Sequence, residues 1–169
     1  MIRKNSITGV IVIFLTIILQ TTILGKFTFR GIKPDYVLIM VILISNYRGS
    51  IKGQLLGFTS GLIEDFLSLS PLGFNSLVNT VIGYLAGITS EKIFLDPILV
   101  PVVFIFIGTL LKTFLSFLIF LIFLKEKADF IYTSSLLIEI GMNIILTPFI
   151  YMFLKVIRVL PISTDSRIS

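Results

Sequence analysis

Long apolar runs separated by short polar segments dominate the chain. Several of these runs approach or exceed the ~20 residues that cross the hydrocarbon core of a bilayer. Such runs are typical of membrane-spanning helices, because a helix satisfies its backbone hydrogen-bonding groups internally. Six spans can be drawn, with approximate bounds 7–24, 36–46, 53–69, 73–89, 97–124 and 134–160. The pattern predicts an all-α integral membrane protein, in which residues 1–169 form a single transmembrane domain, a six-helix transmembrane bundle.

The second run, residues 36–46, is the shortest. A helix rises 1.5 Å per residue, so this run covers only about 16 Å of a hydrocarbon core that is ~30 Å thick. We therefore expect the segment to be a full span only if it is thinly covered or partly re-entrant.

Composition supports a membrane protein and narrows its chemistry. Hydrophobic residues make up 56% of the chain and charged residues only 14%, whereas soluble domains carry roughly 25% charged residues. Cysteine and histidine are both absent. That absence excludes disulfides, Cys/His zinc sites and Ser-His-Asp triads. We expect no catalytic residues, no metal site and no cofactor.

The net charge of +5 comes from basic residues scattered through short loops, as in segments that flank a membrane. We expect no nucleic-acid partner. No small-residue cleavage site follows the first apolar run, so it is expected to stay as an anchor. With the N-terminus inside, eight Lys and Arg residues lie on the cytoplasmic side and five lie outside. This bias predicts that both termini are cytoplasmic.

The third span carries two adjacent carboxylates, Glu64 and Asp65, in an otherwise apolar stretch. At ~100° per residue these acids share one arc of the helix with Gly53, Gly57 and Gly61. The large apolar residues occupy the opposite side. Glycines allow another helix to approach closely, so we expect this arc to face the protein interior, with each acid protonated, paired or hydrogen-bonded.

Three other spans carry matching polar arcs: Asn75, Asn79, Gly83 and Gly87 in the fourth, Lys112 in the fifth, and Ser135, Glu139, Asn143 and Thr147 in the sixth. Together the arcs predict a bundle with a polar, charged interior. Lys112 lies near mid-membrane and is expected to pair with Glu64, Asp65 or Glu139. Whether these charges serve function or only fix the fold stays open, with equal weight on each.

Three segments in order resemble the rod-shape-determining MreD family: "LQTTIL" (19–24), "KPDYVLIMV" (33–41) and "GFTSGLIEDFLSLSPLGFNSL" (57–77). The positions that match the family pattern are Gln20, Pro34, Asp35, Gly57, Gly61, Asp65, Pro71 and Gly73. The specific part of the resemblance covers residues 19–87, and from residue 97 onward it consists mainly of hydropathy. Because only Asp65 occupies the acid position of the pattern, we expect it to matter more than Glu64.

The resemblance implies a component of the bacterial elongation machinery in the inner membrane. It implies direct association with the single-span protein MreC, and an indirect link to MreB filaments and to the RodA/penicillin-binding-protein synthase that builds lateral peptidoglycan. It also implies a six-helix fold similar to the substrate-binding subunits of energy-coupling-factor transporters. We expect Gly53 and Gly57 to contact the MreC-like partner, and Gly83 and Gly87 to be internal.

Two alternatives to a scaffold remain. In a transporter substrate subunit, a small polar ligand would be held by Glu64, Asp65, Glu139, Asn143 and Asn79. In a membrane enzyme that acts on lipid-linked precursors, acids at the membrane interface would hold a metal ion. The acids lie deeper than that, next to a lysine, and Ser and Thr residues lack a base partner. We therefore expect a scaffold that contacts membrane lipid and has no enzymatic activity.

Overall fold

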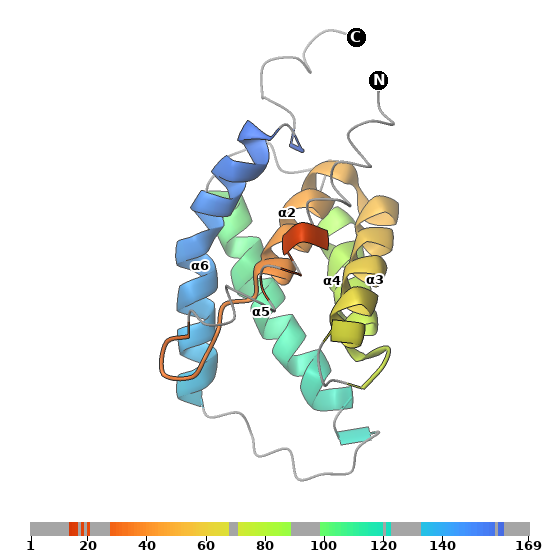
Figure 1. The fold of residues 1–169 in the computed structure, drawn as a ribbon, viewed down its shortest axis with the longest axis vertical. Helices are drawn as coiled ribbons and strands as arrows, with labels where there is room; N and C mark the ends of the chain where they lie inside the picture. The colour runs from red at the N-terminus through yellow and green to blue at the C-terminus, as the bar shows by residue number, and fades with distance from the viewer. Residues whose placement is uncertain are drawn as a thin grey trace, which may run out of the picture.

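The computed structural model describes residues 14–16, 18, 20, 28–67, 71–88, 99–119, 121–122, 133–157 and 159–160. Across these ranges the protein is helical, with an isolated β-bridge between Phe29 and Ile32 (Figure 1). The helices are α2 (Tyr36–Arg48), α3 (Ser50–Leu67), α4 (Phe74–Ile88), α5 (Leu99–Ile119) and α6 (Thr133–Val156). The expected all-α class is confirmed. Most of the first expected span, 7–24, lies outside the described residues, although positions 14–16, 18 and 20 are helical.

Among the described helices, two are long and apolar enough to cross a membrane: α5 over Pro101–Leu118 and α6 over Ser135–Val156. Only 22% of each stretch is buried within the protein, whereas the core helix of a soluble protein would be largely covered. Large apolar side chains such as Phe149, which is 68% exposed, point outward instead. An apolar surface of this kind indicates a protein that resides in a membrane.

Helix α2 lies at the centre of the fold (Figure 1). It contacts α3, α4, α5 and α6, and every residue from position 37 to 45 is at most 4% exposed. The segment is thus surrounded by protein, and whether it crosses the whole membrane stays a prediction. A helix that is apolar on all sides is typically a buried one, and α2 fits this rule. Its 13 residues give a helix of roughly 20 Å that lies in the core of the bundle.

Helices α3 and α4 pack backbone against backbone through glycines. A Cβ atom added to Gly57 would collide with the Asn79 carbonyl group, and one added to Gly53 would collide with the Gly83 carbonyl oxygen. Gly61 and Gly87 are equally close to the opposite backbone. The glycines of α3 (Gly53, Gly57 and Gly61) and those of α4 (Gly83 and Gly87) thus face each other across one helix–helix interface. Gly83 and Gly87 are internal, as expected, but Gly53 and Gly57 are not free to contact a partner protein.

The outer face of α3 confirms the helical arc expected from the sequence. Leu55, Phe58 and Phe66 are 60%, 49% and 70% exposed. Glu64 and Asp65 lie with the glycines on the buried side. The acids therefore face the interior of the bundle, and the apolar side chains face outward.

Candidate functional site

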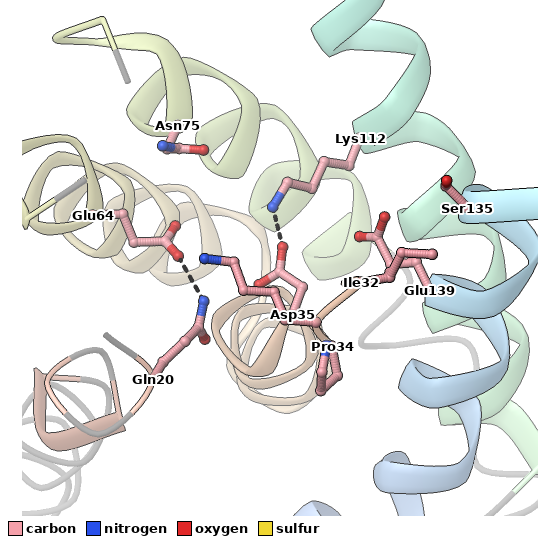
Figure 2. A pocket seen from close by; sticks show the side chains of 10 residues that line it. Gln20, Ile32, Pro34, Asp35, Glu64, Asn75, Lys112, Ser135 and Glu139 are labelled. Atoms are coloured by element: carbon pink, nitrogen blue, oxygen red, sulfur yellow. Dashed lines mark hydrogen bonds and ion pairs between the residues drawn. The ribbon is translucent and has the colours of Figure 1, made fainter. Parts of the chain in front are cut away.

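A cavity of about 420 Å³ opens where the polar arcs of the helices converge (Figure 2). It is lined by Gln20, Ile32, Lys33, Pro34, Asp35, Glu64, Asn75, Lys112, Ser135 and Glu139. The lining thus includes the start of α2, the end of α3, the start of α4, the second half of α5 and the start of α6. Elements far apart in the sequence meet here, at the end of the bundle where α3 ends and α4 begins.

An ion pair between Lys112 and Asp35 lies at the centre of this site (Figure 2). The Asp35 side chain is 7% exposed and the Lys112 side chain 20%. None of the acids expected to pair with Lys112 does so among the described residues; its partner is the residue that precedes α2. Glu64 and Glu139 still interact electrostatically with Lys112, from beyond direct contact. The interior is therefore charged, as expected, but around a different pair.

Asp35 also caps α2. Its Oδ1 accepts a hydrogen bond from the Leu38 N–H at 2.9 Å, and its own N–H donates to Asn143 Oδ1 at 2.9 Å. Asn143 Nδ2 donates in turn to Thr109 Oγ1 at 3.2 Å. The first N–H groups of a helix have no partner within the helix, and an unsatisfied group is costly away from water. Asp35 and Asn143 thus allow α2 to begin inside the bundle.

Gln20 connects α2 to the acidic face of α3. Its Oε1 accepts from the Val37 N–H at 3.2 Å, and its Nε2 donates to Glu64 Oε1 at 3.4 Å (Figure 2). The other oxygen of Glu64 accepts from Asn79 Nδ2 at 2.9 Å. Glu64 is therefore hydrogen-bonded on both oxygens, in line with the expectation that each acid has a partner.

Asp65 has a separate structural role at the start of α4. Its carboxylate accepts from the backbone N–H groups of Gly73, Asn75 and Ser76 and from the Asn75 side chain, at 2.9–3.1 Å. The intervening turn places Gly73 at a φ of 92°, which glycine adopts without strain. The Pro71 carbonyl accepts from the Phe74 N–H at 3.1 Å. Asp65, Pro71 and Gly73 thus form the junction between α3 and α4.

Of the three carboxylates that line the cavity, Glu139 has the fewest hydrogen bonds and ion pairs with described residues. Its side chain points toward the Lys112–Asp35 pair (Figure 2), and it interacts electrostatically with both members. Within the described part of the chain it makes no hydrogen bond and no ion pair. Ser135, one turn earlier on α6, lines the same wall.

The structure brings Glu64, Lys112 and Glu139 together, as the sequence predicts, but leaves Asp65 outside the cavity lining. Asn79 and Asn143 stand behind it as hydrogen-bond partners. Sequence reasoning missed the role of Asp35, although an aspartate directly before an apolar run is a standard helix-start signal. No group of three or more potential ligands among the described residues could hold a metal ion. The polar residues of the site form an ion pair and cap helix starts.

Comparison with known proteins gives one match. The family model described as rod shape-determining protein MreD matches residues 2–157. No curated protein and no solved structure matches the chain. The match extends beyond the sequence motifs to α5 and α6, where the resemblance rested mainly on hydropathy.

Proposed function

Because this chain belongs to the MreD family of rod shape-determining proteins, we propose that it is a membrane scaffold of the bacterial cell-elongation machinery. In this role it binds the single-span protein MreC. Through MreC it is linked to MreB filaments and to the RodA/penicillin-binding-protein synthase, and it helps to organise lateral peptidoglycan synthesis. The observation that carries the proposal is the family match over residues 2–157, which supports a role in determining rod shape.

The proposed setting is the bacterial cytoplasmic membrane, crossed by a six-helix bundle with both termini in the cytoplasm. The ends of α3 and α5 meet the starts of α4 and α6 near the cavity. This alternation supports consecutive spans that run in opposite directions. A fold similar to energy-coupling-factor substrate subunits remains part of the proposal, but the transporter function gains no support from the family match.

The structural roles of the polar side chains favour a scaffold over an enzyme. Asp35, Gln20 and Asp65 satisfy backbone N–H groups at helix starts, and Lys112 is ion-paired. These groups hold helices together. We propose that the protein has no catalytic activity of its own, which a turnover assay with purified protein and lipid-linked wall precursors would test; steady product formation would contradict it.

The partner helix has to bind an outward face, because the glycines lie between α3 and α4. Helices α3 to α6 offer exposed apolar positions, among them Leu55 on α3, Leu85 on α4, Ile107 on α5 and Phe149 on α6. Photo-crosslinking residues placed at these positions would identify the docking face. One face should crosslink to MreC and the others should not; uniform crosslinking, or none from any position, would argue against a specific interface.

The function itself is tested by complementation. In a rod-shaped bacterium depleted of its own MreD protein, this chain and its cognate MreC should restore rod shape and co-purify with each other. Round cells despite normal accumulation of both proteins in the membrane would count against the proposal.

A further inference from the structure

The cavity between α2 and the starts of α4 and α6 contains charges that the scaffold role does not require. Three acids and two lysines are among its ten lining residues. Asp35 and Lys112 neutralise each other, and Glu64 is hydrogen-bonded by Gln20 and Asn79. Glu139 also lies in the wall of the cavity, and it makes no hydrogen bond and no ion pair with a described residue.

Glu139 does not serve the fold in the way the other acids do. Asp35 and Asp65 cap helices, and Glu64 joins three elements. A carboxylate that only supported the bundle would have a comparable protein partner, because a charge away from water is costly unless it is paired. A cationic group that enters the cavity would give Glu139 the partner that the described residues do not supply.

We propose that this cavity binds a ligand through a primary ammonium group, with Glu139 as the main acceptor. The volume of about 420 Å³ lies within the usual range for small-ligand pockets, roughly 300–1,000 Å³. The lining carries three carboxylates against two lysines, one of which is already ion-paired. A cation is therefore favoured over an anion.

The lining residues also restrict the kind of cation. Recognition of quaternary ammonium groups typically uses aromatic side chains, and the described residues that line the cavity include no aromatic one. A divalent metal would need several oxygen ligands around one point, and the described residues contain no suitable group. A primary ammonium instead brings N–H donors that the oxygens of Glu139 and Ser135, both in the cavity lining, can accept. It can come from a free amine or from the ethanolamine headgroup of a phospholipid.

The test uses the full chain purified in detergent free of ethanolamine lipid. Thermal unfolding is followed by circular dichroism while ethanolamine is added, with tetramethylammonium and sodium chloride at matched ionic strength. Ethanolamine should raise the unfolding midpoint saturably, and the two controls should not. The variant Glu139→Gln should weaken the ethanolamine response at least about tenfold, whereas Lys52→Gln, an exposed change at the other end of α3, should not alter it.

The source of the ammonium group is decided by native mass spectrometry after incubation with equal amounts of phosphatidylethanolamine, phosphatidylcholine and phosphatidylglycerol. Selective retention of phosphatidylethanolamine by the wild type, lost in Glu139→Gln, identifies a lipid headgroup. An ethanolamine response without lipid selectivity identifies a free amine. Should Glu139→Gln fail to fold, Ser135→Phe, which fills the same wall, should abolish the response instead.

The proposal is overturned if tetramethylammonium or sodium acts as well as ethanolamine, or if Glu139→Gln keeps full affinity. Absence of binding by both ethanolamine and phosphatidylethanolamine also overturns it. The scaffold role does not depend on this outcome, because shape complementation is measured separately.

Discussion

Lys112 and Asp35 are 77 residues apart in the sequence and form an ion pair in the interior of the bundle. Asp35 uses its other carboxylate oxygen to cap α2. One side chain thus fixes where the central helix begins and neutralises a lysine on α5. Removing either partner leaves a buried charge alone, which makes the pair suitable for a quantitative test.

The first prediction concerns this pair. Lys112→Met should lower the free energy of unfolding by about 3 kcal/mol, because it leaves the Asp35 carboxylate unpaired. Asp35→Asn retains an oxygen for the cap, so it reports mainly on the lost charge. The double variant should be destabilised less than the sum of the two single variants. Chemical denaturation in detergent measures all three, with the exposed Lys52→Met as control; strictly additive effects would show that the two residues are not coupled.

The second prediction ranks the two adjacent acids of α3. Asp65→Leu removes at least four hydrogen bonds at the start of α4 and should cost about 3 kcal/mol or more. Glu64→Gln keeps an acceptor oxygen and should be milder. The folded yield and rod-shape complementation should both follow this order. Equal tolerance of the two changes would refute the capping role of Asp65.

The third prediction uses the glycine interface. Gly57→Leu and Gly83→Leu should each strongly reduce the folded yield, because the new side chain meets the backbone of the opposite helix. Gly141→Ala is the matched control: no atom of the described residues lies within 4 Å of its added Cβ, and it should gain about 0.5–1 kcal/mol from helix propensity. A well-folded Gly57→Leu variant that loses only MreC would restore this surface as a docking site.

The fourth prediction is orientation. The native chain has no cysteine, so single cysteines report cleanly. Phe29→Cys, at an exposed position before α2, should react with an impermeant thiol reagent in intact cells. Lys52→Cys, at the start of α3, should react only after permeabilisation. The reverse pattern would invert the proposed topology.

The arcs of α3 and α6 were predictable because these helices face two distinct environments. Glycines and acids of α3 turn inward while Leu55 and Phe66 turn outward. On α6, the four-residue spacing of Asn143 and Thr147 likewise places both in the interior, at 0% and 1% exposure. Periodicity therefore identified the buried side of α3 and the buried positions Asn143 and Thr147 of α6.

Relations between helices were not predictable in the same way. Helix α2 has no polar face, so its pattern did not reveal whether lipid or protein surrounds it. Asp35 lies just before this helix and was assigned to a loop, although its side chain reaches Lys112. The two glycine arcs were identified, but periodicity does not tell which arcs meet. Long-range pairing requires positions in space, and these came only from the structure.

The central position of α2 has a consequence for the biogenesis of the protein. Asp35 enters the membrane well before Lys112 has been synthesised, and a lone carboxylate there is unfavourable. We therefore expect the core of the bundle to close only once α5 is present. A fragment that ends before Leu99 should remain sensitive to protease in membranes where the full chain is resistant; a resistant fragment would show that the first helices close without α5. On this expectation the native state forms only after two-thirds of the polypeptide, up to Lys112, has left the ribosome.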